Sequence, residues 1–474
     1  NLDADGNGFK LPYIHEIDGC QVPDWVSNTV WYQIFPERFA NGNPNLTPDG
    51  AREWDAAIAP NIDDFFGGDL QGIIDHLDYL KDLGITGIYL CPIFEATTNH
   101  KYDTTDYFEI DRHFGDKEVF ANLVEEAHKR GIKIMLDAVF NHIGYQSAKW
   151  QDVLKNGEKS PYKDWFHIQE FPVTEDKLQN PRQLPYHTFA FASYMPKLNT
   201  ANPEVRDYLL SVATYWIENF DIDAWRLDVA NEIDHQFWRD FRKAVLAKKP
   251  DLYILGEIWH TSQPWLQGDE FHAVMNYPLS ESIKDYFLRQ RKKTEQFISE
   301  INSQSMYYKQ QISEVMFNLL DSHDTERILT TAKGNIQHVK AALTFLYLQK
   351  GTPCIYYGTE LALIGGPDPD CRRVMPWDRV SEDNDMLNFM KKLIQVRKEV
   401  ASIIQHGNYR LEEVKPDVLS LKWNYQGKEV QAIFNQSSEK YTLDRDSVDL
   451  ASHCQFEDGQ QVILPDGFVI TVSK

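Results

Sequence analysis

The sequence predicts an α/β protein built on a (β/α)₈ TIM barrel, with an inserted loop domain after the third strand and a C-terminal antiparallel β-sandwich domain. Short apolar runs alternate with amphipathic stretches of helical period over most of the chain, a pattern typical of βα units and a parallel sheet. Eight such apolar runs are present, which is the strand number of a closed barrel. Near the C-terminus, strict alternation of apolar and polar residues replaces the helical period, which indicates antiparallel strands.

The eight predicted strands follow one another with helices between them. The strands are Val30–Phe35, Gly87–Cys91, Lys133–Val139, Ala224–Asp228, Tyr253–Glu257, Ala273–Asn276, Val315–Leu320 and Cys354–Tyr357. The clearest helices are Leu70–Leu83, Lys117–Arg130, Pro203–Asn219, Gln236–Lys248 and Gln337–Gln349. An open doubly wound sheet is the alternative, but no glycine-rich phosphate-binding loop follows the first strand. The pattern therefore favours the barrel.

Loop lengths and composition divide the chain into parts. Roughly sixty residues, rich in Pro, Tyr, His and Phe, separate the third strand from the helix near Pro203, and a connection of that length is usually functional or a small domain. We expect a catalytic barrel over residues 26–398, with an inserted domain at about 140–200, and a C-terminal β domain over residues 399–474. Residues 1–25 are expected to be a linker or a remnant segment.

Charge and cysteine content exclude several classes of protein. A net charge of −23 argues against nucleic acid as a partner. No run of about 20 apolar residues occurs, so the sequence predicts no membrane span. The five cysteines are scattered and odd in number, which favours a reducing compartment over a disulfide framework. We therefore expect a cytoplasmic protein, and the start at Asn1 leaves a mature secreted form as the alternative.

Three predicted strands deliver a carboxylate where the strand ends. Asp228 ends the segment DAWRLD, Glu257 ends ILGE, and Asp324 ends NLLDSHD. The carboxyl ends of barrel strands meet at one face, where the active sites of such barrels are found. Cleavage of a glycosidic bond needs one carboxylate as nucleophile and one carboxylic acid to protonate the leaving oxygen. The three acids therefore predict a glycosidase site.

The neighbours of these acids support that chemistry. Arg226 lies on the same face of its strand as Asp228, and its charge is expected to keep that carboxylate ionised. Glu257 stands at an apolar strand end beside Trp259, where desolvation is expected to raise its pKa as a general acid requires. The alternatives are a buried ion pair for the first and a solvated loop glutamate for the second. The cluster 321–324 suits sugar hydroxyls, with a metal site as its competitor.

Five segments together resemble one enzyme family. They are DAVFNH (137–142), MPKLN (195–199), WRLDVANE (225–232), GEIWH (256–260) and NLLDSHD (318–324). With them the chain resembles the α-amylase family of retaining glycoside hydrolases, from about Pro23 to the C-terminus. The VANE and MPKLN segments are more similar to the neopullulanase, cyclomaltodextrinase and maltogenic amylase group than to ordinary α-amylases or oligo-1,6-glucosidases.

The resemblance implies a role for each matching residue. Asp228 matches the nucleophile, Glu257 the general acid/base and Asp324 the transition-state stabiliser. The residues that match substrate contacts are Tyr102, His142, Arg226, Glu232, Trp259, His323, Asp368 and Arg372. The implied activity is cleavage of α-1,4-glucosidic bonds in starch, maltodextrins or cyclodextrins to maltose-sized products, with α-1,6 cleavage and transglycosylation in addition. An endo-acting α-amylase, a glucosyltransferase and a non-catalytic glucan-binding module are the alternatives.

The predictions of a calcium site and of the oligomeric state concern two segments in which the chain departs from the family pattern. Several relatives bind Ca²⁺ after the first strand, and the matching positions here are Asn41, Asn43, Thr47, Gly67 and Asp69. Only one of these is a carboxylate, and Ca²⁺ affinity rises with carboxylate count, so a weak and a firm site both stay open. No organic cofactor is expected. The group usually has an N-terminal β domain that pairs subunits, and without it we expect a monomer or weak dimer with a more open cleft.

Overall fold

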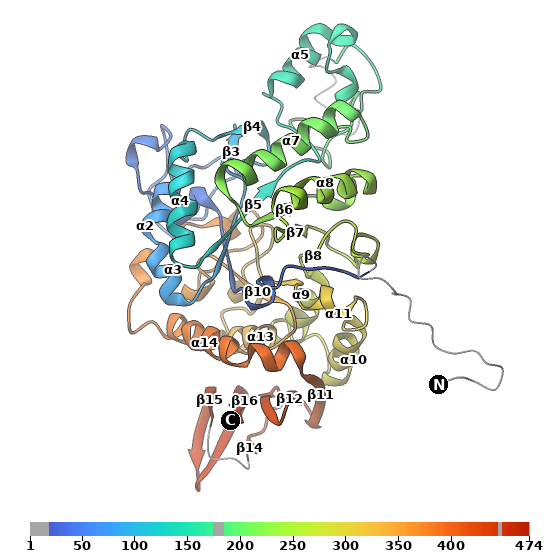
Figure 1. The fold of residues 1–474 in the computed structure, drawn as a ribbon. Helices are drawn as coiled ribbons and strands as arrows, with labels where there is room; N and C mark the ends of the chain where they lie inside the picture. The colour runs from blue at the N-terminus through green and yellow to red at the C-terminus, as the bar shows by residue number, and fades with distance from the viewer. Residues whose placement is uncertain (1–18, 174–183, 444–447, 474) are drawn as a thin grey trace, which may run out of the picture.

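The computed structural model describes residues 19–173, 184–443 and 448–473 (Figure 1). Eight parallel strands form one sheet in the order β8-β7-β6-β5-β2-β1-β10-β9, and a parallel bridge between Met275 and Phe317 joins its two edges into a barrel. The barrel strands are β1 (Trp31–Ile34), β2 (Gly87–Leu90), β5 (Lys133–Ala138), β6 (Ala224–Leu227), β7 (Tyr253–Gly256), β8 (Ala273–Val274), β9 (Phe317–Asn318) and β10 (Thr352–Tyr356). All eight predicted strands are confirmed.

The inside of the barrel is filled by large side chains. Trp31 on β1 stacks on Tyr253 of β7 with ring centroids 6.1 Å apart, and it contacts Phe317 of β9 at 6.0 Å. Gly87 pairs with Trp31 in the β1–β2 ladder, and a Cβ at Gly87 would lie 2.6 Å from the Trp31 ring. The glycine therefore makes room for the indole. Strands buried on both faces explain why the sequence showed near-continuous apolar runs.

Helices surround the barrel (Figure 1). Side chains of Asp116, Asn202, Asp234 and Asn384 cap the first turns of α4, α7, α8 and α14, which explains where these helices begin. The helices are α1 (Pro36–Phe39), α2 (Leu70–Asp75), α3 (Leu77–Leu83), α4 (Lys117–Lys129), α5 (Ala148–Asn156), α7 (Pro203–Phe220), α8 (His235–Lys248), α9 (Tyr277–Ile283), α10 (Thr294–Gln304), α11 (Gln310–Ser313), α12 (Ile328–Thr331), α13 (Ile336–Tyr347) and α14 (Asp385–His406).

Two helical boundaries differ from those predicted. The single helix predicted at Leu70–Leu83 is two helices, because the backbone at His76 leaves the helical region with φ −111° and ψ 10°. Helix α14 continues to His406, so the helical part of the chain ends beyond the expected boundary at residue 398. None of the helices in the described residues is long and apolar enough to cross a membrane.

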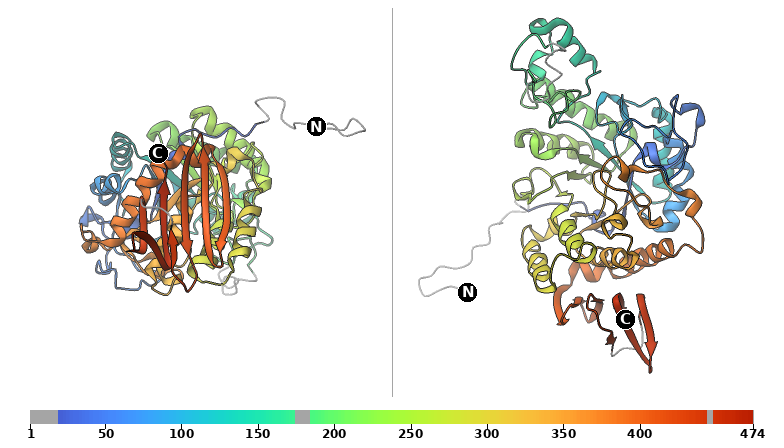
Figure 2. Two further views of the ribbon diagram at one scale, coloured as in Figure 1. Left: turned by 90° about the horizontal axis from the view of Figure 1, so that it is seen from below. Right: turned by 180° about the vertical axis from the view of Figure 1, so that it is seen from behind.

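The inserted segment projects from one end of the barrel (Figures 1 and 2). Trp150 of α5 is the centre of its small core and packs on Phe166 and Tyr186 with ring centroids 4.7 and 4.6 Å apart. An isolated bridge between His142 and Lys197 joins the two ends of the segment at the barrel. Part of the insertion expected at about 140–200, residues 174–183, lies outside the described residues, as do residues 1–18 of the expected linker.

The C-terminal part is an antiparallel sheet, seen face-on in Figure 2. Its strands are β11 (Asn408–Lys415), β12 (Val418–Tyr425), β13 (Lys428–Asn435), β14 (Tyr441–Leu443), β15 (Leu450–Glu457) and β16 (Gln460–Val472). The predicted antiparallel C-terminal domain is confirmed. Its described strands are linked through the long β16, which pairs with β13 through residues 468–472 and with β14 through residues 461–463.

A β-hairpin that the sequence did not predict follows β2. Its strands are β3 (Phe94–Ala96) and β4 (Thr104–Ile110), and their register shifts twice. The turn between them includes Tyr102, preceded by Lys101 with a φ of +63°. Lys101 is buried and forms an ion pair of 2.9 Å with Asp111, and this contact stabilises the strained backbone at Lys101. The hairpin thereby delivers Tyr102 to the end of the barrel where the predicted acids lie.

Candidate active site

A cavity of about 500 Å³ opens at the carboxyl ends of the barrel strands. Asp228 follows β6, Glu257 follows β7 and Asp324 follows β9, and all three line the cavity. The other predicted site residues that line it are Tyr102, His142, Glu232, Trp259, His323, Asp368 and Arg372. The remaining one, Arg226, lies fully buried beneath the acids. Residues from distant parts of the sequence therefore converge as predicted.

Arg226 contacts three carboxylates at once. Its Nη1 donates to Oδ1 of Asp228 at 2.7 Å and to Oδ1 of Asp137 at 2.8 Å. Its Nη2 forms an ion pair with Oε2 of Glu257 at 3.0 Å. The predicted proximity of Arg226 and Asp228 is confirmed. One cation faces three acids, so the cluster would carry an excess of negative charge if all three were ionised, and this favours protonation of at least one of them.

The pKa directions of the two central acids differ from the expectation. Burial raises the pKa of Glu257, but Arg226 and the N–H groups of Val229 and Trp259, at 2.9 and 3.0 Å, outweigh it and hold that pKa below its ordinary value. The predicted raised pKa of Glu257 is therefore wrong for the unliganded site. Burial raises the pKa of Asp228 well above its ordinary value, and the charge of Glu257 adds to this against the effect of Arg226. The two pKa values therefore move in opposite directions, because Arg226 and the two N–H donors outweigh burial at Glu257 whereas burial dominates at Asp228.

Asp137 lies buried below the cavity, next to Arg226. Its Oδ2 accepts hydrogen bonds from the hydroxyl groups of Tyr89 at 2.6 Å and Tyr102 at 2.8 Å, while Arg226 contacts the same carboxylate. The sequence showed Asp137 in the polar segment 137–142 but assigned it no role. Tyr89 could not be recognised from the sequence, because it lies within the apolar run of β2 and no polar neighbour marks it.

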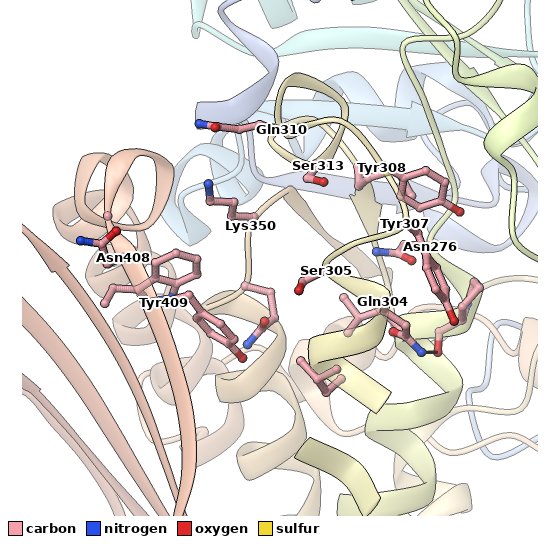
Figure 3. Close-up of a pocket in the computed structure, with 17 residues that line it drawn as sticks. Asn276, Gln304, Ser305, Tyr307, Tyr308, Gln310, Ser313, Lys350, Asn408 and Tyr409 are labelled. Carbon is pink, nitrogen blue, oxygen red and sulfur yellow. Dashed lines mark hydrogen bonds between the residues drawn. The ribbon is translucent and has the colours of Figure 1, made fainter. Parts of the chain in front are cut away.

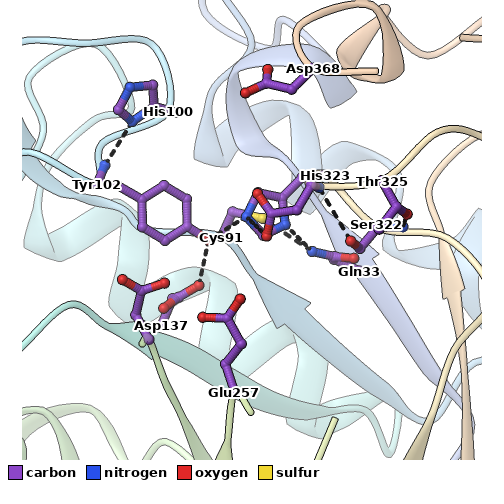
Figure 4. A network of polar contacts seen from close by, with 12 residues as sticks. Gln33, Cys91, His100, Tyr102, Asp137, Glu257, Ser322, His323, Thr325 and Asp368 are labelled. Carbon is purple, nitrogen blue, oxygen red and sulfur yellow. Dashed lines mark hydrogen bonds and ion pairs between the residues drawn. The ribbon is translucent and has the colours of Figure 1, made fainter. Parts of the chain in front are cut away.

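His323 is held between two side chains (Figure 4). Nε2 of Gln33 lies 2.8 Å from Nδ1 of His323, and the hydroxyl of Tyr102 lies 2.7 Å from Nε2. Burial lowers the pKa of His323 well below its ordinary value, so the ring is neutral. An amide N–H on Nδ1 leaves the ring proton on Nε2, where it faces Tyr102 and Oδ2 of Asp324 at 3.1 Å. Gln33, which the sequence did not single out, thus determines the tautomer.

Asp324 is the most accessible of the three acids. Its side chain is 29% exposed, whereas those of Asp228 and Glu257 are each 8% exposed. Burial and the charge of Glu257 raise the pKa of Asp324 to about 7, against the lowering effect of Arg372. Arg372 lies 3.5 Å from Asp324 and forms an ion pair of 2.9 Å with Asp368. Asp368 and Arg372 thus form a charged wall next to Asp324.

Trp259 and Glu232 lie beside Glu257. The Trp259 ring stacks on Tyr277 with centroids 3.9 Å apart and remains 48% exposed, so its outer face is open to a ligand. Glu232 pairs with Lys197 at 3.3 Å, and Lys197 belongs to the MPKLN segment of the insertion. The insertion and the barrel therefore share this side of the cavity.

Several apolar residues of the rim escaped the sequence analysis. Ile62, Phe189 and Tyr194 line the cavity, and the ring of His142 stacks on Phe189 with centroids 5.1 Å apart. They come from long irregular loops, where no periodic pattern marks them. Asp321, in contrast, belongs to the predicted cluster but is buried and accepts a hydrogen bond from Thr359, so it does not reach the cavity.

The predicted calcium positions lie close together, but their side chains form hydrogen bonds within the loop. Nδ2 of Asn41 donates to Oγ1 of Thr47 at 2.8 Å. The Asp69 carboxylate accepts from the backbone N–H groups of Gly42, Asn43 and Gly72 at 2.7–3.2 Å, so it caps the first turn of α2. In the described residues no group of three or more His, Cys, Asp or Glu side chains is arranged to hold a metal. The one carboxylate among the five positions is therefore already used by backbone N–H groups.

The fold and the acid cavity agree with a match to a known family. Residues 33–443 match the family described as alpha amylase, catalytic domain. The chain belongs to the α-amylase family and is a glycosidase of that family.

Individual relatives show which group within the α-amylase family the chain is most similar to. It is 55% identical over 432 residues to the intracellular maltogenic amylase of Bacillus subtilis, covering 91% of this chain and 72% of that protein. It is 54% identical over 433 residues to the cyclomaltodextrinase of Geobacillus thermopakistaniensis, again covering 91% and 72%. The solved structure of a cyclomaltodextrinase matches with a TM-score of 0.89 and 45% identity, covering 98% of this chain and 81% of that one. The resemblance to this group of the family is confirmed.

Proposed function

We propose that this chain cleaves α-1,4-glucosidic bonds of starch, maltodextrins or cyclodextrins by a retaining mechanism and releases maltose-sized products, with α-1,6 cleavage and transglycosylation as further activities. The observation that supports this most is the convergence of Asp228, Glu257 and Asp324 on one cavity above Arg226. In this proposal the barrel with its insertion is the catalytic domain, over about residues 26–398, and the C-terminal sheet is a separate domain.

The first step is attack on the sugar. Asp228 attacks the anomeric carbon while Glu257 gives a proton to the leaving oxygen, so the glycosidic bond breaks and an ester to Asp228 forms. This step needs Asp228 ionised and Glu257 protonated, whereas in the unliganded site the pKa of Asp228 is raised and that of Glu257 is lowered. Both carboxyl groups contact Arg226. Sugar binding removes water from the cavity, and this desolvation favours the neutral form of Glu257.

The second step releases the product. Glu257 takes a proton from a water molecule or from a sugar hydroxyl, whose oxygen then attacks the anomeric carbon and restores the Asp228 carboxylate. Water gives hydrolysis and a sugar acceptor gives transglycosylation. The ionised form of Asp324, the most accessible acid, stabilises the positive charge that develops on the sugar ring in both steps.

The remaining predicted contacts fit positions along a glucan. Tyr102 is the aromatic platform under the sugar at the cleavage point, with His142 and His323 beside it. Asp368 and Arg372 bind the next sugar on the non-reducing side. The exposed face of Trp259 stacks on a leaving-side sugar, and Glu232 accepts its hydroxyl groups.

Product analysis on β-cyclodextrin, starch and pullulan tests this function. We expect the Asp228→Asn variant to have a kcat at least about 10³-fold lower, because an amide does not displace the leaving group. Asp383→Asn, at an exposed position on the loop before α14, is the matched control and should keep full activity. Full activity of Asp228→Asn would show that the nucleophile is misassigned. Failure of the wild type to release reducing sugar from all three substrates would favour a glucan-binding module.

For calcium, we propose that the loop of Asn41 and Asp69 is stable without the ion. Its only carboxylate among the five matching positions is already occupied by backbone N–H groups. We expect EDTA to leave the Tm unchanged, and the measurement is thermal unfolding with and without the chelator. A lower Tm in EDTA that added Ca²⁺ restores would instead establish the site.

We also propose a cytoplasmic monomer or weak dimer. All five cysteines, which are in the described residues, are free thiols, and the Bacillus subtilis relative is named intracellular. Among the described residues, few large apolar side chains are exposed away from the cavity, with Met306 and Phe456 the most exposed, and stable interfaces bury larger apolar surfaces. Light scattering of the purified chain measures the oligomeric state, and a stable dimer at micromolar concentration would contradict this proposal.

A further inference from the structure

Lys197 joins three segments of the chain beside the acid cavity. Its Nζ donates to the backbone carbonyl of Glu232 at 3.0 Å and to Oε2 of the same residue at 3.3 Å. Nζ also donates to Oδ1 of Asn141, in the segment that follows β5. An ammonium group has three protons to donate, and these three acceptors satisfy all of them. The side chain is 18% exposed, so these contacts are largely screened from water.

The backbone that carries Lys197 is fixed on both sides. The N–H of Lys197 donates to the carbonyl of His187 within the insertion at 2.9 Å. The N–H of Leu198 donates to the carbonyl of Asn141 at the barrel at 3.0 Å. Folding of the insertion has therefore already restricted this lysine, and its pair with Glu232 costs less conformational entropy than a pair between two free surface side chains.

Glu232 depends on Lys197 for its orientation. It ends the 3-10 turn Ala230–Glu232 after β6 and lines the cavity, with its side chain 42% exposed. No other side chain in the described part of the chain forms a hydrogen bond or ion pair with its carboxylate. Lys197 holds Oε2, which leaves Oε1 to accept a hydrogen bond from a ligand in the cavity. The lysine therefore determines where this acceptor atom lies.

The contacts of Glu257 with the same turn do not involve Lys197. The N–H of Ala230 donates to the carbonyl of Glu257 at 3.2 Å. Trp238 donates its indole N–H to the carbonyl of Ala230 at 2.9 Å, which holds the start of the turn against α8. Loss of the Lys197 ammonium should therefore release Glu232 at the end of the turn and leave the general acid/base in place.

We propose that Lys197 is a positioning residue that orients Glu232 toward a sugar on the leaving side of the cavity, and that it thereby raises the share of reactions completed by a sugar hydroxyl instead of water. The inference rests on the proposed function, because it concerns the second step. In that step the acceptor oxygen bonds to the anomeric carbon, its proton passes to Glu257, and the bond to Asp228 breaks. An acceptor sugar competes with water only while it is held in place.

The ratio of transfer products to hydrolysis products tests this role. Lys197→Met removes the ammonium group and keeps most of the side-chain length. With maltotriose at high concentration as donor and acceptor, the ratio should fall about three- to tenfold, because the acceptor loses an oriented hydrogen bond. Dilute α-maltosyl fluoride has no sugar on its leaving side, so its hydrolysis should continue at the wild-type rate. Lys197→Arg retains the charge and should keep most of the transfer.

Two other lysines provide matched controls. Lys149→Met changes a lysine of the same insertion, whose Nζ lies 4.2 Å from the ring centroid of Tyr208. Lys350→Met changes a lysine that lines a different cavity, of about 370 Å³, between the barrel and the C-terminal sheet (Figure 3). That cavity shares no lining residue with the acid cavity. Both variants should keep the wild-type ratio, and the Tm of every variant checks that it folds.

A double variant shows whether Lys197 acts through Glu232. Glu232→Gln alone should lower the ratio, and adding Lys197→Met should lower it by less than about twofold more, because coupled residues are not additive. Full additivity, an unchanged ratio in Lys197→Met, an equal loss of rate with α-maltosyl fluoride, or a wild type that hydrolyses without any transfer would each overturn the inference and leave hydrolysis intact. If the wild type released no sugar from either substrate, the proposed function would fail, and the inference with it.

Discussion

Arg226 determines the charge balance of the acid cavity. It is completely buried, and its guanidinium faces Asp137, Asp228 and Glu257 at 2.7–3.0 Å. A buried carboxylate without such a partner is costly, because desolvation disfavours its charged form. Arg226 therefore lowers the free-energy cost of burying the catalytic acids in the folded protein. Its contribution to stability and its contribution to chemistry are the same set of contacts.

Replacing Arg226 by glutamine should lower the free energy of unfolding by about 3–5 kcal/mol at neutral pH, because three buried carboxyl groups lose their cation. The folded-state pKa values of Asp137 and Asp228, which are already raised, would then rise further, and that of Glu257 would rise from below its ordinary value. Stability from a raised pKa is present at low pH and is lost as pH rises through it. Urea unfolding of both chains at pH 5 and pH 8 should therefore show the larger deficit at pH 8. An equal deficit at both values would contradict the charge argument.

Arg372 is predicted to set the acid limb of the pH profile. Asp324 must be ionised to stabilise positive charge, and its pKa is about 7 with Arg372 lowering it. Activity should therefore fall as pH drops through about 7. In Arg372→Met the pKa of Asp324 rises, so the acid limb of kcat/KM for maltotriose should move to higher pH. A limb that stays in place, or moves to lower pH, would show that another group controls it.

Sequence reasoning at this scale succeeded where alternation along one strand was enough. Arg226 and Asp228 are two residues apart on β6, and period two places them together. It failed for the pKa of Glu257, which is lowered first by the charge of Arg226 and then by the backbone N–H group of Val229. That residue has a φ of +46°, and the turn that points its N–H at Glu257 is a property of the folded backbone.

The ends of the barrel strands place the acids, and Gly256 shows how closely this is constrained. It is the last residue of β7, directly before Glu257, and a Cβ there would lie 2.6 Å from the Phe271 ring. The absence of a side chain therefore brings the strand end close to Phe271.

Gly256→Ala should reduce kcat about 10–100-fold, because the strand end that holds Glu257 must shift by a fraction of an ångström. Stability should fall by about 1–3 kcal/mol from overpacking. Steady-state kinetics on maltotriose and urea unfolding measure the two effects. Adding Phe271→Leu in the same chain should restore part of both, and a double variant as impaired as Gly256→Ala would refute the steric explanation.

Elements with strong local patterns were predictable and those without were not. The barrel strands and the helices α4, α7, α8 and α13 are buried or amphipathic over their length, so period and composition indicate them. The β3–β4 hairpin is short and its register shifts twice, so its pairing depends on the barrel beneath it. The break between α2 and α3 also has no local breaker residue.

At the scale of the whole molecule, the C-terminal sheet is attached to the barrel through a shared apolar core. Phe434 of β13 contacts Phe287 and Phe345 on the barrel side at 5.3 and 6.0 Å, and Phe468 of β16 within the sheet at 5.8 Å. Trp423 of β12 donates its indole N–H to the carbonyl of Leu348 at 2.8 Å, and this residue follows α13. The two parts therefore stabilise each other.

Phe434→Ala should lower the free energy of unfolding by about 3–5 kcal/mol, because it leaves a cavity in this shared core. If the interface couples the two parts, tryptophan fluorescence and far-ultraviolet circular dichroism should still report one coincident transition in guanidinium. The conservative Phe434→Leu variant is the control and should lose less. Two separate transitions in the wild type would show that the sheet and the barrel unfold independently.

The sequence by itself determined the barrel, the order of its strands, the antiparallel C-terminal strands and the three acids with most of the residues around them. Those features depend on local periodicity and on residues at strand ends, which can be read along the chain. Only the tertiary structure decided in which direction the pKa of Glu257 moves, how Gln33 and Asp137 complete the site, and that a second cavity exists between barrel and sheet. These depend on atoms from distant segments that meet in space, and no spacing along the sequence specifies their distances.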